Sequence, residues 1–424
     1  MECNATTQNT SPERVILVGL ACSEVNGFDN STPQTLAELE ELVLTAGGEC
    51  VGQLTQNKHK PDPRTLIGEG KVEELTEYVQ SLEATLIVFD NLLSPSQTRN
   101  LEKDCDVRVI DRSVLILDIF ASRAQTKEGK LQVELAQYKY TLPRLFGKGV
   151  ELSRLGGGIG TRGPGETKLE TDRRHIKRLI EKLEQDLAEV RKNRNIQRRQ
   201  REKGQIPLVS LVGYTNAGKS TLFNLLTDAG VSVRNRLFET LDPTVKRFEI
   251  SPGNFVLMSD TVGFIRKLPH HLVEAFKATL EELLFADLLL HVVDASSPES
   301  FEHMQVVDSL IEQLGAGDKP ALYVFNKIDL APEFLPATQH SVCISAKTGD
   351  GVPGLLDKII EACGLDSFTV QVKLGYDQAR LVDMMYKEAV VESLDYAPEH
   401  ILAKITAPKK FLSIVEQHCE IEYE

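Results

Sequence analysis

The feature that most constrains the fold of this chain is the octapeptide Gly213-Tyr-Thr-Asn-Ala-Gly-Lys-Ser220, which fits the phosphate-loop pattern GxxxxGK[ST]. It follows the apolar stretch Leu208–Val212 and precedes the helical pattern Ser220–Leu226, as a phosphate loop requires. The glycines let backbone N–H groups surround a phosphate, the lysine neutralises phosphate charge, and the serine hydroxyl binds Mg²⁺. A glycine turn before a helix is the alternative, but the full match and its context predict an α/β nucleotide-binding domain.

Three further short motifs follow in the order that a guanine-nucleotide site requires, each after an apolar strand pattern. In Asp260-Thr-Val-Gly263 the carboxylate can hold a Mg²⁺-bound water, and the glycine N–H can approach the γ-phosphate. In Asn326-Lys-Ile-Asp329 the aspartate can accept hydrogen bonds from guanine N1–H and the 2-amino group. Adenine has neither donor, so such a site rejects it by roughly 10⁴-fold or more. The backbone of Ser345-Ala-Lys347 is suited to the guanine 6-oxo group.

The segment Leu237–Thr244 lies where a switch loop brings a threonine to Mg²⁺ and the γ-phosphate. Thr240 and Thr244 both have the required hydroxyl, and the residues alone do not decide between them. After the glycine of the second motif many GTPases have a glutamine that orients the attacking water, whereas this chain has Phe264. We therefore expect slow intrinsic hydrolysis that a partner accelerates. A nucleotide switch without catalysis is the alternative.

Asn216 in the phosphate loop allows two interpretations. It resembles the asparagine by which potassium-activated GTPases hold a monovalent cation against the phosphates, so that K⁺ does the electrostatic work of an arginine finger. It is otherwise a loop asparagine that hydrogen-bonds its own turn. Equal GTP turnover in K⁺ and in Na⁺ would exclude the first interpretation.

Outside the phosphate-loop domain, which we assign to residues 206–365, apolar stretches alternate with helical patterns from Arg14 to about residue 125. This alternation predicts a parallel, helix-covered sheet, so residues 1–125 are assigned to an N-terminal α/β domain. Within it, Gly68-Glu-Gly-Lys71 opens a helix and resembles half of a phosphate loop. A plain helix entry is one interpretation, and a second nucleotide site that binds ATP is the other.

Residues 126–205 have a different pattern, with six glycines and a proline in Leu155–Thr167 between a helix and a long charged helix. The narrow apolar stripe of the long helix favours a helical hairpin or coiled coil. Residues 366–424 are assigned to a small α+β domain. Its expected elements are a strand over 368–374, a helix over 378–393, a strand over 401–407 and a helix over 411–418.

Charge is distributed unevenly along the chain. The net charge is −14, yet residues 168–203 contain thirteen Lys/Arg against seven Asp/Glu, a net of +6, so the remainder carries −20. A basic helix beside a glycine-rich loop fits an RNA contact, since cations neutralise phosphates and glycines let a backbone enter a narrow pocket. A solvated helix face with local ion pairs is the alternative. The candidate RNA contacts are Gly156, Gly157, Gly158, Arg162, Arg173, Arg174, Lys177, Arg178, Arg191, Lys192, Arg194, Arg198 and Arg199.

Composition excludes several other classes of protein. No stretch approaches the roughly 20 apolar residues of a membrane helix, and the first residues lack the pattern of a signal peptide. The seven cysteines form no CxxC pair, as expected in a reducing compartment. His270 and His271 have no metal-ligand partner in spacing and are expected to begin a helix. The acidic remainder argues against strong membrane binding and leaves weak association open.

Several segments together resemble the HflX family of translational GTPases over residues 14–365: LFETLDPT, DTVGFIRKLPHHLVEAFKATLEE, GGGIGTRGPGETKLETDRR, VRVIDRSVLILDIFASRA and EGKLQVELAQ. The C-terminal part matches only in position and size. The resemblance implies a cytosolic GTPase that binds the large ribosomal subunit and splits stalled or idle ribosomes after stress. It also implies that Thr240 is the Mg²⁺ threonine. Glu239 stands where the family usually has a small residue.

The motifs and the resemblance together predict a fold and a set of site residues. The fold class is α/β: a P-loop GTPase domain preceded by an α/β domain with a long helical hairpin and followed by a small α+β domain. Within the site, Ser220, Thr240 and Asp260 (through water) hold Mg²⁺, and Lys219, Thr240 and Gly263 act in catalysis. The predicted nucleotide contacts are Gly213, Tyr214, Thr215, Asn216, Ala217, Gly218, Lys219, Ser220, Thr221, Phe238, Glu239, Thr240, Leu241, Asp242, Asp260, Thr261, Val262, Gly263, Asn326, Lys327, Ile328, Asp329, Ser345, Ala346 and Lys347.

Three functions are compatible with these sequence features. The first is a GTP-driven factor that remodels ribosomes, a monomer off the ribosome with GTP or GDP, Mg²⁺ and ribosomal RNA as partners and no DNA. The second is a nucleotide-gated regulatory scaffold in which hydrolysis is incidental. The third is an RNA chaperone with an additional ATP-dependent activity in the N-terminal domain. The basic helix and glycine loop favour the first or the third.

Overall fold

The structure is a computed structural model that describes residues 12–22, 31–145, 164–202, 206–230, 237–240, 244–251, 254–267, 282–336 and 340–423, with the backbone alone at 164–169, 191 and 193–202 and at a few C-terminal positions. The chain forms two compact units. Among the described residues, the first unit contains the chain up to Gln200 together with 237–240 and 261–267, and the second contains the rest.

The N-terminal part of the first unit is a four-stranded parallel sheet with the order β2-β1-β3-β4, as the βα alternation predicts. β1 is buried from Val15 to Leu20 because helices cover both faces of the sheet. The helices α2 and α3 pack on one face, and α1 contacts α4. The elements are β1 (Arg14–Cys22), α1 (Pro33–Ala46), β2 (Glu49–Lys58), α2 (Glu69–Ser81), β3 (Leu86–Phe89), α3 (Pro95–Cys105), β4 (Arg108–Asp111) and α4 (Arg112–Arg123).

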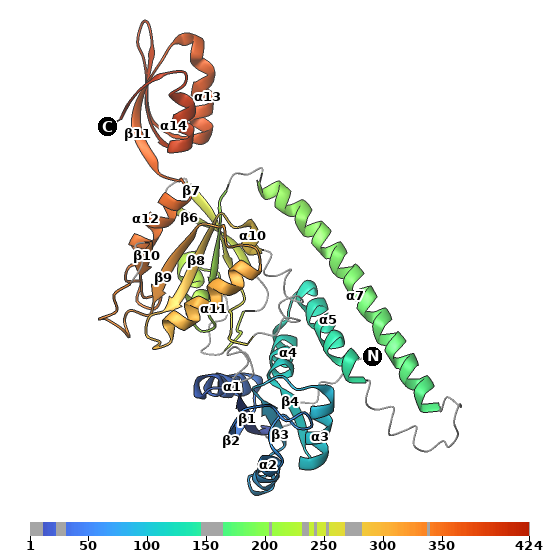
Figure 1. Cartoon of the computed structure of the whole chain (residues 1–424). Coiled ribbons are helices and arrows are strands. Elements are labelled where there is room, and N and C mark those ends of the chain that lie inside the picture. The colour runs from blue at the N-terminus through green and yellow to red at the C-terminus, as the bar shows by residue number, and fades with distance from the viewer. Residues whose placement is uncertain are drawn as a thin grey trace. The chain divides into compact units, whose positions relative to one another are not determined.

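A helical pair follows this sheet, formed by α5 (Lys127–Arg144) and the 39-residue α7 (Pro164–Glu202). Leu135 of α5 and Leu183 and Leu187 of α7 form a small buried cluster, so the two helices lie side by side (Figure 1). Lys139 Nζ and Glu184 Oε1 lie 2.8 Å apart across the same contact. The expected narrow apolar stripe of α7 is therefore the surface that meets α5.

The central part of the second unit is a six-stranded sheet with the order β10-β9-β8-β5-β7-β6, in which only β6 pairs antiparallel among the described strands. Because β5 lies in the middle, its carboxyl end, where the phosphate loop starts, is flanked by β8 and β7. The elements are β5 (Leu208–Gly213), α8 (Lys219–Thr227), β6 (Thr244–Ser251), β7 (Asn254–Asp260), α10 (Glu282–Phe285), β8 (Leu288–Asp294), α11 (Ser300–Gln313), β9 (Ala321–Asn326), β10 (Ser341–Cys343) and α12 (Val352–Ala362).

The C-terminal part of the second unit has a βαββαβ order with an antiparallel sheet β12-β13-β11-β14, the split βαβ arrangement. The helix expected over 378–393 is wrong at its end, because α13 stops at Glu388. β-branched Val390 and Val391 then begin a strand that pairs with β13. The elements are β11 (Ser367–Leu374), a 3₁₀ turn (Tyr376–Gln378), α13 (Ala379–Glu388), β12 (Val390–Tyr396), β13 (Ile401–Pro408), α14 (Lys409–Val415) and β14 (Glu420–Tyr423).

The two central strands of this small sheet alternate between a buried and an outward face. Val370, Val372 and Leu374 of β11 pack into the core together with residues of α13 and α14. The outward positions of β11 and β13 include Thr369, Gln371, Lys373, Leu402, Lys404 and Thr406. This face is therefore mostly polar.

Leu187→Ala tests whether the apolar seam holds α7 against α5. Truncation of a buried leucine costs about 2–5 kcal/mol, so amide hydrogen exchange should accelerate in both helices around the seam. Gln185→Ala, at an exposed position two residues earlier, is the matched control and should leave exchange unchanged. Equal protection in the two variants would contradict the assigned seam.

Candidate functional site

The phosphate loop begins at the carboxyl end of β5 and needs glycine at two positions. Gly213 has φ +150°, and a Cβ there would lie 2.2 Å from the carbonyl oxygen of Val292 in β8. Gly218 has φ +96°, and its Cβ would lie 2.1 Å from Nδ2 of Asn326. Asn216 between them has φ +61°, a left-handed conformation that asparagine tolerates better than most residues, and it is exposed. Both interpretations of Asn216 are compatible with this geometry.

Lys219 is buried inside the phosphate loop. Its Nζ donates to the carbonyl oxygens of Gly213, at 3.0 Å, and Tyr214, at 2.7 Å. Burial lowers the pKa of Lys219 to about 8, and the nearby charge of Asp260 opposes that shift. The ammonium group therefore points into the loop. A phosphate bound there would raise the pKa of Lys219 and favour its protonated form.

Ser220 and Asp260 lie together, as a Mg²⁺ site requires. The Ser220 hydroxyl donates to Oδ2 of Asp260 at 2.7 Å, and Asp260 is fully buried at the end of β7. Hydroxyl and carboxylate oxygens are the hard ligands that Mg²⁺ prefers, and it commonly completes its shell with phosphate oxygens and water. Among the described residues, no cluster of three or more His, Cys, Asp or Glu side chains could hold a metal without such help.

The base-recognition motifs are joined to the phosphate loop through Asn326. Its Nδ2 donates to the carbonyl oxygen of Ala217 at 2.9 Å, and its Oδ1 accepts from the N–H of Ala346 at 2.9 Å. The Ser345 hydroxyl donates to Oδ1 of Asp329 at 2.7 Å and so orients the carboxylate expected to bind guanine. Three loops predicted from separate motifs are therefore brought together at one edge of the sheet.

Two side chains of this region escaped the motif analysis. Asp294, the last residue of β8, accepts from Nζ of Lys327 at 2.6 Å, and Lys327 has a left-handed φ of +66°. His303 of α11 stacks on the ring of Tyr214, with centroids 3.9 Å apart. Asp294 follows an apolar strand just as Asp260 does, and that signal could have found it. Nothing local in the sequence marks His303.

The described parts of the two switch segments belong to the first unit. Phe238, Glu239 and Thr240 are present, with Phe238 buried and Thr240 partly buried, whereas Leu241 and Asp242 lie outside the described residues. Thr261, Val262 and Gly263 continue the chain directly from Asp260, and Phe264 is 2% exposed. No polar side-chain atom is therefore available at position 264.

The candidate RNA contacts are described in part. On α7, Arg174, Lys177, Arg178 and Lys192 are exposed, and Arg173 is partly exposed. Glu170 Oε1 lies 3.1 Å from Arg174 Nε, so at least one of these exposed cations also forms an ion pair within the helix. The side chains of Arg191, Arg194, Arg198 and Arg199 lie outside the described set, as do the loop residues Gly156, Gly157, Gly158 and Arg162 and the pair His270 and His271.

Gly68-Glu-Gly-Lys71 begins α2 as the plain helix-entry interpretation expects. Gly68 N–H donates to Oε1 of Gln56 at 2.8 Å, and Lys71 Nζ pairs with Glu74 at 2.8 Å. Within the described ranges, every helix is too short or too polar to cross a bilayer.

Three family models match successive parts of the chain. They are described as GTP-binding GTPase N-terminal over residues 33–121, GTP-binding GTPase Middle Region over 123–201, and 50S ribosome-binding GTPase over 208–327.

Curated relatives named GTPase HflX match most of the chain. One from Caldanaerobacter subterraneus subsp. tengcongensis is 48% identical over 92% of this chain and 90% of the relative. One from Escherichia coli K12 is 45% identical over 85% of this chain and 86% of the relative. Among solved structures, a complex of SsGBP with GDP has a TM-score of 0.46 and 25% identity over 83% of this chain and 98% of that chain.

Asp329→Asn tests guanine recognition. The amide keeps an acceptor for N1–H but presents its donor to the 2-amino group, so GTP affinity should fall by about 10²-fold or more. Xanthosine triphosphate has an oxo group at that position and should bind the variant better than GTP does. Competition against a fluorescent nucleotide measures both affinities, and unchanged GTP preference would contradict the role of Asp329.

The depressed pKa of Lys219 predicts a pH-dependent nucleotide affinity. Only the ammonium form pairs with phosphate, so binding must take up a proton once the pH exceeds the free-state pKa of about 8. GDP affinity should therefore decline as pH rises from about 7 to about 9, with proton uptake detected by calorimetry in two buffers. Lys219→Arg stays charged over this range, and equal proton uptake by both proteins would contradict the assignment.

Proposed function

The chain belongs to the HflX family of GTPases, and on this premise we propose that it uses GTP to act on the large ribosomal subunit, separating stalled or idle ribosomes after stress. It binds guanine nucleotides and is a GTP hydrolase with a ribosome-binding type of GTPase domain. We propose that the target is the large ribosomal subunit, that the reaction is ribosome splitting, and that stress triggers it.

The observation that carries the proposal is the exposed cationic surface of α7. Arg174, Lys177, Arg178 and Lys192 are exposed on one helix that an apolar seam fastens to α5. A long helix with exposed Lys and Arg side chains can bind the sugar-phosphate backbone of folded RNA, because each contact to a phosphate releases a counterion. The acidic balance of the rest of the chain supports a contact confined to this segment.

In the proposed reaction, each group of the site has a separate task. Ser220 and Thr240 would hold Mg²⁺, with Asp260 acting through water, and the ion would supply neutralising charge to the phosphates of GTP. Lys219 pairs with phosphate oxygens, and the N–H of Gly263 donates to the γ-phosphate. Because Phe264 has no polar atom, the ribosome completes the arrangement that orients the attacking water.

The division of the chain follows from these tasks. We propose that 206–365 hydrolyses GTP, that 126–205 reaches ribosomal RNA, and that 1–125 and 366–424 flank them as separate domains. We further propose that the protein acts in the cytoplasm and is a monomer off the ribosome.

Neutralising the basic helix tests the proposal. A variant with Gln in place of Arg191, Lys192, Arg194, Arg198 and Arg199 should bind large subunits roughly 10²-fold more weakly at physiological salt and lose subunit-stimulated GTP turnover. Its GTP turnover without ribosomes should stay at the starting level, because these residues lie outside the nucleotide site. Sedimentation with purified large subunits and phosphate release measure the two effects.

A matched control carries the same number of charge changes on other surfaces, with Gln in place of Lys60, Lys103, Lys127, Lys130 and Lys373. It should keep ribosome affinity and stimulation. If both variants bind equally well, the basic helix is not the ribosomal contact. If large subunits do not stimulate the unchanged protein at all, the scaffold alternative replaces the proposal.

A further inference from the structure

The first switch segment is attached to the N-terminal domain by an aromatic contact and an ion pair. Phe238 is buried and meets Phe120 of α4 edge to face, with ring centroids 4.6 Å apart. Glu239 Oε2 lies 3.2 Å from Nη2 of Arg123, also on α4, and the glutamate side chain is only 9% exposed. Glu239, next to the switch threonine, thus has a specific cationic partner on α4.

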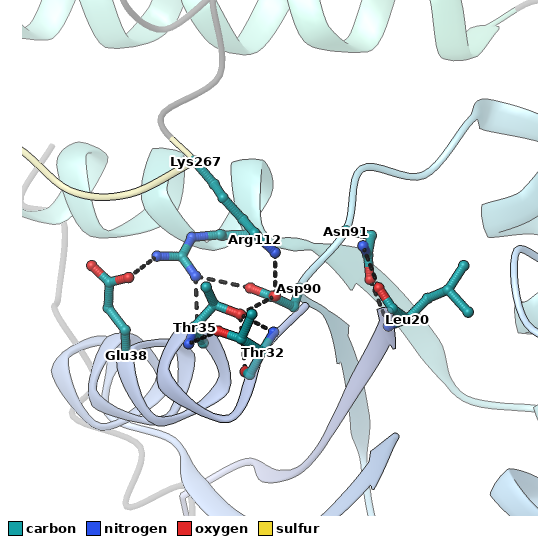
Figure 2. Close-up of polar contacts among 8 residues, drawn as sticks. All are labelled: Leu20, Thr32, Thr35, Glu38, Asp90, Asn91, Arg112 and Lys267. Carbon is teal, nitrogen blue, oxygen red and sulfur yellow. Dashed lines mark hydrogen bonds and ion pairs between the residues drawn. The ribbon is translucent and has the colours of Figure 1, made fainter. Parts of the chain in front are cut away.

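The second switch segment is attached to the same domain through Lys267. Its Nζ donates to Oδ2 of Asp90 at 2.5 Å, and the two side chains are 7% and 0% exposed. Figure 2 shows the lysine extending from its own segment toward Asp90, which lies directly after β3. Lys267 has a left-handed φ of +55°, so the backbone also turns at this point.

The receptor for Lys267 is built entirely by the N-terminal domain. Arg112 donates through Nη1 to Oδ1 of Asp90 at 2.9 Å and through Nη2 to Glu38 at 2.7 Å. The Thr35 hydroxyl donates to Oδ2 of Asp90 at 2.7 Å (Figure 2). Two carboxylates and one guanidinium carry a net charge of −1, which one further cation neutralises. Asp90 directly follows β3 and Arg112 directly follows β4, so the cluster lies at the carboxyl edge of the parallel sheet.

The ionisation of Asp90 supports this arrangement. Burial opposes the charged form, but the charges of Arg112 and Lys267 and the hydrogen bonds from Lys267 and Thr35 outweigh it, so the pKa of Asp90 lies below its ordinary value. The carboxylate is therefore charged throughout the neutral range and available to hold the lysine.

These attachments lie close to the reacting groups along the chain. Thr240 is the neighbour of Glu239, with Cα atoms about 3.8 Å apart. Lys267 follows Gly263 by four residues, which span at most about 14 Å. An ion pair that fixes Glu239 or Lys267 therefore limits where Thr240 and Gly263 can lie.

We propose that Arg123 and Asp90 are positioning residues for GTP binding, because they hold both switch segments on the N-terminal domain through Glu239 and Lys267. In GTPases the γ-phosphate and Mg²⁺ draw the switch threonine and glycine toward the phosphate loop. A switch segment that an ion pair holds on the N-terminal domain is less free to follow the γ-phosphate. GTP must work against the two ion pairs, whereas GDP, which has no γ-phosphate, does not.

The consequence is a change in preference between the two nucleotides. Weakening either ion pair should tighten binding of a non-hydrolysable GTP analogue by about fivefold or more while leaving GDP affinity within about twofold. A gain of affinity distinguishes this positioning role from simple structural damage, which would weaken both nucleotides.

The experiment compares full-length variants without ribosomes, using competition against a fluorescent GDP. Arg123→Glu and Lys267→Met should each raise the ratio of GTP-analogue affinity to GDP affinity. The double variant Arg123→Glu with Glu239→Arg restores an ion pair of reversed polarity and should return the ratio to within about twofold of the unchanged protein. Lys267→Arg keeps the charge and should also preserve it.

Lys130 is an exposed residue of α5. Lys130→Glu makes the same charge change as Arg123→Glu and is the control for a general electrostatic effect. A ratio that stays constant or falls in the two single variants overturns the proposal. A rise that the charge-swapped pair does not reverse, or that Lys130→Glu reproduces, also overturns it. Cooperative thermal unfolding of each variant confirms that the comparison is made on folded protein.

Discussion

The guanine-nucleotide site depends on one buried side-chain amide. Asn326 donates to the carbonyl of Ala217 in the phosphate loop and accepts from the N–H of Ala346 in the Ser345-Ala-Lys347 loop. An amide is suited to this task because it offers a donor and an acceptor in one plane, which a carboxylate or an alkyl chain does not. Gly218 is glycine for the same reason, since a Cβ there would collide with this amide. The loops are thus arranged by the protein's own hydrogen bonds, and nucleotide binding need not assemble them.

Much of this arrangement could be predicted from the sequence because its determinants are local. Apolar strands, glycine turns and helix starts lie next to one another in the chain, so they indicated the parallel N-terminal sheet and the four nucleotide motifs. What the motifs did not reveal were the partners of their side chains. Lys327 meets Asp294 and Tyr214 meets His303 because of how α11 and the strands pack. Such contacts depend on tertiary geometry, and no local pattern in a single sequence predicts them.

Three features could not be predicted from local sequence patterns. The helix expected to reach Ser393 ends at Glu388, because pairing with β13 outweighs a helical pattern that is weakened by two adjacent valines. The contact between Asp90 and Lys267 joins residues 177 positions apart, and neither carries a motif that would suggest the other. No motif in the sequence links Glu239 to Arg123 either, and only the structure shows that the two side chains form an ion pair.

The outward face of the C-terminal sheet has a consequence for how that domain can recognise anything. Sheets that read single-stranded RNA place aromatic rings on their central strands, and each ring stacks a base. Here six of the outward side chains of β11 and β13 are two threonines, two lysines, one glutamine and one leucine. Within the described residues, these positions offer no ring on which a nucleobase could stack, and both lysines already pair inside the domain, Lys373 with Glu420 and Lys404 with Glu392. Any contact that this face makes would therefore rest on charge and hydrogen bonds, and it would weaken as ionic strength rises.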